Sequence, residues 1–297
     1  MRYTKPPLSF EEQAQRLLDR GMIGDKAVMV SRLKVVNYYR LSGYWFPFRD
    51  HPTDSFKPGT TFETVWSRYI FDRRLRLVVM DAVERIEVAV RTMLAYEHAH
   101  AFKSPFAYAE DSAALPGLDK EQRARLLDSL TAEMRASKER FAVHFRGKYG
   151  ADHDWMPIWM ATEIMTFGHI LTLYRGSIPK IKQSVAARLG VHDKVLGSWL
   201  LALNTIRNIC AHHGRLWNRE LGIRPMIPVK DRNWHVPIEV ANDRMFGVLT
   251  LLKFSLDRVA PQSKWTARLQ ALLSEFPAIP LTSMGFPSDW KSCPLWL

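Results

Sequence analysis

The stretch VLGSWLLALNTIRNICAHHGRLWN, residues 195–218, decides where this chain places its core and where it places its chemistry. Residues 195–204 are apolar almost throughout, with the length and composition of a buried helix and with Asp193 available as its N-cap. Beyond them, Arg207 and His212 interrupt what would otherwise be a core helix. The stretch therefore predicts one helix with a buried first half and a partly polar second half.

Successive residues of an α-helix are rotated by about 100°, so the side chains in the polar half of this helix project from different faces. Taking Asn204 as zero, His212 and Arg215 fall within about 80° on one side, with Asn208 between them. Arg207 lies about 60° away on the other side. The opposite half carries Leu203, Ile206, Ile209, Cys210 and His213. We expect a polar face made of two amides, two guanidiniums and one imidazole.

The residues alone leave two interpretations of this polar face open. In the structural interpretation, His212 and His213 cap the helix C-terminus before Gly214, where the macrodipole favours cations, and the arginines are solvated or paired. In the functional interpretation, a whole polar face that follows an apolar run needs a ligand. Two sequence resemblances favour the second interpretation.

The spacing of Arg207 and His212, with Asn208 directly after the arginine, resembles the R-x4-H motif of HEPN-domain ribonucleases. The longer string RNICAHHGRLWNR, residues 207–219, resembles the Abi-type abortive infection family, the AbiD/AbiF group of phage-resistance proteins. Further segments are similar to the same family: YYRLSGYW at 38–45, WMATEIMTFG at 159–168 and MGFPSDW at 284–290. The resemblance therefore extends from residue 38 to the end of the chain.

This resemblance implies a metal-independent endoribonuclease that leaves 2′,3′-cyclic phosphate and 5′-hydroxyl ends, with Arg207 and His212 as the catalytic pair. RNA supplies its own nucleophile, the 2′-hydroxyl, so the protein must supply proton transfer and positive charge. His212 titrates near neutrality and can move the proton, while Arg207 can hold the phosphate through two parallel hydrogen bonds. The expected supporting residues are Asn208, His213, Glu163 and Arg215.

The resemblance also implies that the protein forms an oligomer and that its ribonuclease activity is restrained in the cell. One histidine cannot readily be both acid and base, so a homodimer is expected in which two R-x4-H helices face each other. A toxin-type role in abortive infection is implied, with a small regulatory RNA or an antitoxin restraining the activity. The competing hypothesis is a non-catalytic RNA-binding or scaffolding protein of the same family.

The rest of the chain predicts an all-α fold, a multi-helix bundle of HEPN type by resemblance, with a long central helix. That helix is expected over about 61–101, with Thr60 and Glu63 as a capping box and Leu77 in its apolar stripe. Shorter helices are expected at about 9–20, 25–39, 119–148, 158–171, 178–189, 243–259 and 263–273.

Three parts of the chain are expected from these patterns. Residues 1–60 form an N-terminal helical and aromatic segment, 61–297 the bundle, and 103–154 a charged helical insertion, unless the chain is one compact domain. Glu163 lies in the apolar run 158–171, where a carboxylate needs a partner. That partner is expected to be the Arg207/His212 site or another arginine.

With 42 Lys and Arg against 30 Asp and Glu, the formal charge is +12, which favours a polyanionic partner and nucleic acid first. A basic surface without such a role is the alternative. The aromatic segment 38–48 predicts either a glycine-containing turn that covers the end of the bundle or a surface for RNA. In the second case RNA is bound by Tyr39, Arg40, Tyr44, Trp45, Arg73, Arg74 and Arg76.

No metal, other cofactor or membrane segment is expected. Cys210 and Cys293 form neither a disulfide framework nor a C-x-x-C site, and the E-x-x-H pattern of ferritin-like metal sites occurs once, at 97–100. The sequence lacks a run of 18 apolar residues and a signal-peptide pattern, so a soluble cytoplasmic protein is expected.

Overall fold

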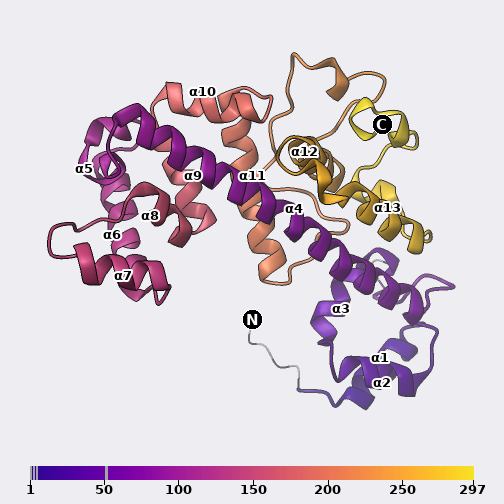
Figure 1. Cartoon of the computed structure of the whole chain (residues 1–297). Helices are drawn as coiled ribbons and strands as arrows, with labels where there is room; N and C mark the ends of the chain where they lie inside the picture. The colour runs from indigo at the N-terminus through magenta and orange to yellow at the C-terminus, as the bar shows by residue number, and fades with distance from the viewer. Residues whose placement is uncertain (1, 3, 5, 51–52) are drawn as a thin grey trace.

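The computed structural model describes residues 2, 4, 6–50 and 53–297, and every regular element within them is helical (Figure 1). The β features of this described part are two isolated bridges, Ile23 with Thr61 and Arg49 with Phe56. The predicted all-α, multi-helix fold is therefore confirmed.

One long helix, α4 (Phe62–Phe102), forms the axis of the molecule. Its N-cap is Thr61, whose side chain accepts a hydrogen bond from the Thr64 amide, so the predicted cap at Thr60 is wrong by one residue. It ends where Lys103 adopts a left-handed conformation. Its buried stripe runs through Val65, Phe71, Leu75, Val79, Val83, Ile86, Val90 and Leu94.

Leu77 of α4 does not belong to that stripe, contrary to the sequence prediction. Its side chain is 61% exposed, because the neighbouring turns present Leu75, Arg76 and Val79 to the core instead. The core side of α4 also carries Asp72 and His98, two polar residues that are almost completely buried.

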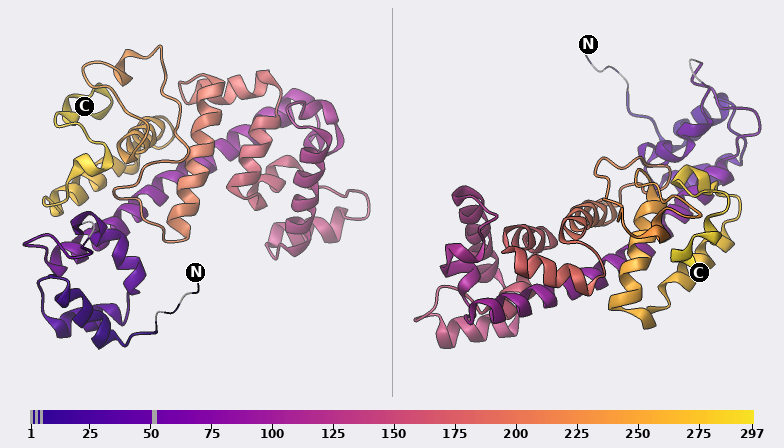
Figure 2. Two further views of the ribbon diagram at one scale, coloured as in Figure 1. Left: turned by 180° about the vertical axis from the view of Figure 1, so that it is seen from behind. Right: turned by 90° about the horizontal axis from the view of Figure 1, so that it is seen from above.

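The other helices pack along α4 in three groups (Figures 1 and 2). Its N-terminal end carries the first group, α1 (Phe10–Asp19), α2 (Lys26–Leu33) and α3 (Tyr38–Trp45). Its middle carries α11 (Asp193–Ala211), α12 (Met245–Val259) and α13 (Trp265–Glu275). Toward its C-terminal end lie α5 (Ala107–Glu110), α6 (Lys120–Ala136), α7 (Arg140–Tyr149), α8 (Ile158–Ile164), α9 (Phe167–Gly176) and α10 (Pro179–Arg188).

Several predicted helices are divided in the structure. The helix expected over 25–39 is α2 and α3, because Asn37 caps a new helix by accepting a hydrogen bond from the Tyr39 amide. The one expected over 119–148 is α6 and α7, separated at Ser137, and the one over 158–171 is α8 and α9.

The aromatic segment is helical rather than a glycine turn, since Gly43 lies inside α3.

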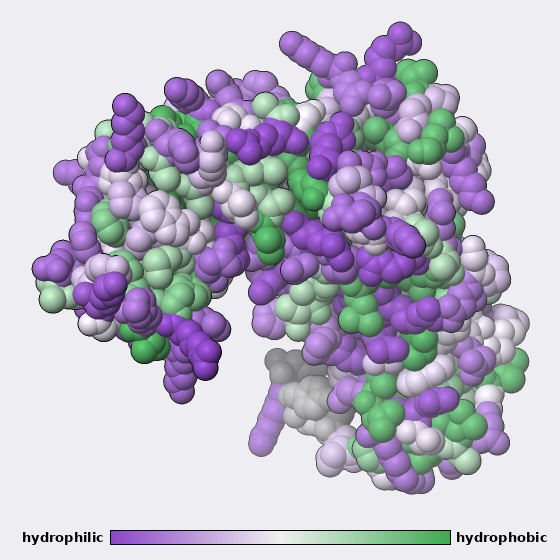
Figure 3. Space-filling view, in the orientation of Figure 1, coloured by the Kyte–Doolittle hydropathy of each residue, from purple (hydrophilic) through white to green (hydrophobic). Residues whose placement is uncertain are grey.

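The visible surface is largely polar. The face shown in Figure 3 is mainly hydrophilic, and its hydrophobic side chains form small separate patches. None of the helices in the described ranges is long and apolar enough to cross a membrane.

Candidate functional site

The motif helix α11 ends at Ala211, directly before the two histidines. His212 is the C-cap residue, and its amide donates to the Asn208 carbonyl oxygen at 2.9 Å. His213 has a left-handed φ of 58°, and the Gly214 amide donates to the Ile209 carbonyl oxygen at 2.7 Å. The chain therefore leaves the helix axis here.

This ending corrects two details of the sequence analysis. Arg215 was expected on the polar face of a continuing helix, but it lies in the segment beyond the helix. The N-cap is His192 and not Asp193, which is the first helical residue. Asn208 and His212 are exposed at the end of α11, as the polar-face pattern predicted.

Arg207 lies half-buried on α11 and donates to the side-chain oxygen of Asn208 at 3.3 Å. The charge of Arg207 acts on Glu87 of α4, which pairs with Arg91 at 2.8 Å. Burial raises the pKa of Glu87, and the charges of Arg91 and Arg207 oppose that rise. Arg207 itself forms no ion pair within the described residues, so its guanidinium keeps donors available for an anion.

Glu163 does not hold the position that the sequence suggested. Its side chain is exposed, and the structure connects it to the arginine cluster only through its backbone carbonyl, which accepts from Arg91 at 3.4 Å. The same arginine donates to the Met165 carbonyl oxygen at 3.0 Å. Arg91 thus fastens the junction of α8 and α9 to α4, and among the described residues the Glu163 carboxylate forms no hydrogen bond or ion pair with Arg207 or His212.

A cavity of about 400 Å³ separates α3 from the end of α11. The α3 side of this cavity is formed by Asn37, Tyr39, Arg40, Gly43 and Tyr44, and the opposite side by His212, His213, Gly214 and Arg215. Two segments that lie about 170 residues apart in the chain thus share one cavity. In the sequence alone, these two segments appear as separate surfaces.

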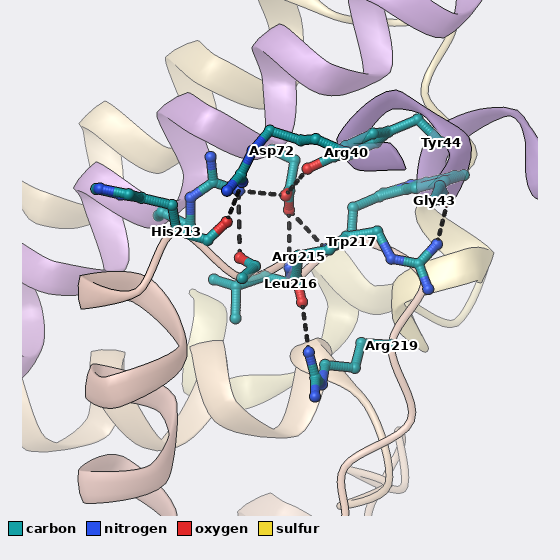
Figure 4. A network of polar contacts seen from close by, with 11 residues as sticks. Arg40, Gly43, Tyr44, Asp72, His213, Arg215, Leu216, Trp217 and Arg219 are labelled. Carbon is teal, nitrogen blue, oxygen red and sulfur yellow. Dashed lines mark hydrogen bonds and ion pairs between the residues drawn. The ribbon is translucent and has the colours of Figure 1, made fainter. Parts of the chain in front are cut away.

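Asp72 organises the base of this region, as Figure 4 shows. The residue is fully buried, and one carboxylate oxygen accepts from the Tyr44 hydroxyl at 2.6 Å and from Arg76 at 2.5 Å. The other oxygen accepts from the amides of Leu216 at 3.1 Å and Trp217 at 2.6 Å. A single carboxylate therefore joins α3, α4 and the segment after α11.

The electrostatics of Asp72 follow from this burial. Desolvation raises the pKa of Asp72, while the hydrogen bonds from Tyr44 and Trp217 and the charge of Arg76 act against the rise. Burial, together with the nearby carboxylate, raises the pKa of the Tyr44 phenol. Sequence reasoning missed Asp72. The available signal was an aspartate four residues before an arginine on the core-facing side of the long helix.

Two arginines hold the backbone of the turn after α11, and a third arginine, from the segment after the turn, binds α3 (Figure 4). Arg40 donates to the His213 carbonyl oxygen at 2.6 Å, and Arg76 donates to that of Gly214 at 3.3 Å. In the reverse direction, Arg215 donates to the Gly43 carbonyl oxygen of α3. The position of the two histidines is thus set by donors from α3 and α4.

The residues predicted to bind RNA fall into two groups. Tyr39, Arg40 and Arg73 are exposed, and the first two line the cavity. The second group is engaged with other parts of the protein: Tyr44, Trp45 and Arg76 are buried, and Arg74 forms an ion pair at the surface.

The members of the second group have identified structural partners. Trp45 packs edge-to-face against Tyr38, with ring centroids 4.8 Å apart, and Tyr44 and Arg76 are bound to Asp72. Arg74 is only partly buried and is paired with Glu275. Tyr44, Trp45 and Arg76 are thus buried and engaged with structural partners, and their role in RNA binding stays a prediction.

No group of three or more His, Cys, Asp or Glu side chains suited to a metal ion occurs among the residues described. The two members of the E-x-x-H pattern at 97–100 have separate partners: Glu97 pairs with Arg188, and Nδ1 of His100 lies 2.8 Å from the Tyr96 carbonyl oxygen. His98, between them in sequence, is buried against Ser177.

Comparison with known proteins adds one match. A family model described as Abi-like protein matches residues 31–218, which include α3, α4 and the whole motif helix with its histidines. No curated protein and no solved structure matches the chain.

Proposed function

This chain belongs to the Abi-like protein family, whose name denotes abortive infection, and we propose that it is a metal-independent endoribonuclease acting in phage defence. The observation that carries the proposal is the state of two side chains on the motif helix. Arg207 has no ion-pair partner in the described part of the chain, and His212 presents an exposed imidazole to a cavity.

These two groups match what RNA cleavage requires. The 2′-hydroxyl loses a proton as its oxygen attacks the adjacent phosphorus, and the 5′-oxygen leaves with a proton, giving a 2′,3′-cyclic phosphate and a 5′-hydroxyl. His212 exchanges one of these protons, and Arg207 stabilises the charge that develops on the phosphoryl oxygens. Asn208 and His213, next to the pair in sequence, support it.

A second copy of the chain completes the site in this proposal. His212 lines the cavity beside α3, whereas Arg207 lies near Glu87 of α4. The two side chains therefore project from different sides of the end of α11. In a homodimer with α11 facing α11, the second His212 supplies the other acid or base. Specific activity should then rise with protein concentration until dimerisation saturates, and cleavage by a strict monomer would contradict the dimer.

The proposed activity needs restraint in the host cell. A nuclease with a charge of +12 attracts cellular RNA without selectivity, so we include a small regulatory RNA or an antitoxin that holds the activity in check. Co-purification of the protein from cells that carry its neighbouring genes, followed by RNA sequencing and mass spectrometry, tests for such a partner.

The direct test is incubation of the purified protein with total RNA in EDTA, followed by mapping of the cut ends. We expect 2′,3′-cyclic phosphate and 5′-hydroxyl ends from the wild-type protein and none from folded His212→Ala protein. Binding of RNA without cleavage at any protein concentration would instead support the non-catalytic RNA-binding function.

A further inference from the structure

We infer that Tyr39 is the platform on which an unpaired RNA base stacks beside His212, so that the cavity between α3 and the end of α11 selects single-stranded RNA. The inference rests on the proposed ribonuclease function and specifies its substrate class. It is carried by the cavity that α3 and the motif turn share, and by the state of the Tyr39 ring.

The Tyr39 ring is free to meet a ligand although its backbone is fixed. Its side chain is 79% exposed, and no other ring stacks on it within the described residues. Its amide donates to the Asn37 side chain at 2.7 Å, and its carbonyl oxygen accepts from the Ser42 hydroxyl at 2.6 Å. An aromatic side chain has few rotatable bonds, so this exposed ring loses little conformational entropy when a base covers it.

The cavity next to this ring has the charge and size for a nucleotide. Its walls carry Arg40, Arg215, His212 and His213 but no carboxylate. Arg40 and Arg215 each donate a hydrogen bond from one guanidinium nitrogen to a backbone carbonyl oxygen. Their remaining N–H groups are available to bind a phosphate. The volume of about 400 Å³ lies within the range of about 300–1,000 Å³ that is typical of small-ligand pockets.

Stacking on one isolated ring discriminates between unpaired and paired RNA. A base inside a duplex has neighbours on both faces, so it reaches Tyr39 only after it is unstacked, whereas a base in a loop or a single strand already exposes a face. Every base has such a face, so the selection concerns RNA structure more than RNA sequence. The phosphate next to the stacked base then lies near His212.

The test measures binding and cleavage separately. The binding probe is a dye-labelled 2′-O-methyl oligoribonucleotide, which lacks the attacking hydroxyl and cannot be cut, used either single-stranded or annealed to its complement. Wild-type, Tyr39→Ala, Tyr39→Phe and Tyr39→Trp proteins are titrated by fluorescence anisotropy, and the same set is assayed for cleavage of unmodified RNA. The matched control is Tyr96→Ala, an aromatic residue of α4 that is 52% exposed and lies outside this cavity.

We expect the wild-type protein to prefer the single strand and Tyr39→Ala to weaken that binding about ten- to a hundredfold. Tyr39→Phe and Tyr39→Trp should retain the preference, because the ring and not the hydroxyl supplies the stacking surface, and Tyr96→Ala should leave it unchanged. The melting temperature should not change in Tyr39→Ala, since the ring packs against nothing in the core.

The inference is overturned if wild-type protein fails to bind the single strand, if it binds the duplex equally well, or if Tyr39→Ala binds as the wild type does. The proposed function fails in a different way. If single-strand binding depends on Tyr39 but unmodified RNA stays intact, the base platform is correct and the nuclease assignment is wrong.

Discussion

Arg40 of α3 donates a 2.6 Å hydrogen bond to the backbone carbonyl oxygen of His213, 173 positions later in the chain. This bond ties the aromatic N-terminal segment to the turn that presents His212. His213 is held in a left-handed conformation, so loss of this bond should change the backbone of the turn and with it the position of the His212 side chain. Arg40 is therefore expected to position the site in addition to attracting RNA.

Replacing Arg40 by alanine should reduce cleavage more than it reduces stability. The bond is exposed, so its loss should cost about 1 kcal/mol of unfolding free energy, while the freed turn should lower kcat at least tenfold. Urea denaturation and single-turnover kinetics give the two values. The matched control is Arg219→Ala, which removes a 3.2 Å bond to the Arg215 carbonyl oxygen in the same segment. Equal kinetic losses in both variants would argue against a specific role for Arg40.

Alanine at either position of the catalytic pair should leave the protein folded but abolish most of its cleavage activity. His212→Ala and Arg207→Ala should each lower cleavage about 10²- to 10⁴-fold with little change in melting temperature, because neither side chain is in the core. Arg207→Lys should also fail, since an ammonium does not replace the planar fork. His144→Ala, an exposed histidine of α7, is the control. Full activity of folded His212→Ala would refute the mechanism.

Asp72→Ala should destabilise the protein by about 3–5 kcal/mol, because it leaves Arg76, the Tyr44 hydroxyl and two amides buried without their acceptor. Asp81→Ala provides the comparison. That aspartate also pairs with an arginine four residues later, Arg85, and with Arg268, but both pairs are partly exposed and should each be worth about 1 kcal/mol or less. Urea unfolding measures both, and similar losses would show that burial of the Asp72 carboxylate is not what matters.

His98 should make the stability of the protein depend on pH. It is 1% exposed, and burial lowers its pKa from 6.5 to about 4. The Ser177 hydroxyl donates to the Leu173 carbonyl oxygen at 2.6 Å, so the 2.7 Å contact between His98 and Ser177 assigns the proton to Nε2. Nδ1 has no hydrogen-bond partner among the described residues, and protonating it would bury a charge without an acceptor.

The sign of this dependence follows from the depressed pKa. Between pH 6.5 and about 4 the unfolded chain binds a proton at His98 that the folded chain does not, so stability is lost as pH falls through this window, by about 3 kcal/mol in total. His98→Gln should lack this component, whereas His100→Gln, at an exposed neighbour, should retain it. Identical pH profiles for the wild type and His98→Gln would contradict the prediction. Unfolding free energies measured across this pH range provide the test.

Local interactions explain which parts of the fold were predictable. The helices expected over 9–20 and 119–148 begin where they were predicted, because their capping boxes, Ser9 with Glu12 and Asp119 with Gln122, each depend on residues three positions apart. The length of α4 was predicted closely, because its sequence contains no proline or glycine. Predictions failed where two local signals competed, as at Asn37, which starts a new helix inside a continuous apolar pattern.

The sequence by itself also determined the composition of the candidate site. A polar helix end with Arg207, Asn208 and His212 could be read from periodicity, since the α-helix places each side chain at a known angle. Membership of the Abi-like family was visible in the same string and is confirmed by the family match over residues 31–218.

Only the tertiary structure decided which segments meet this helix end. The cavity with Tyr39, the Arg40 bond to His213 and the buried Asp72 all join residues far apart in the chain. No local pattern encodes such contacts, because a polar or aromatic side chain has the same helical spacing whether it faces water or a distant segment. For the same reason Tyr39 and Tyr44, five residues apart in one aromatic stretch, differ completely: the first is exposed at the cavity, and the second is buried against Asp72.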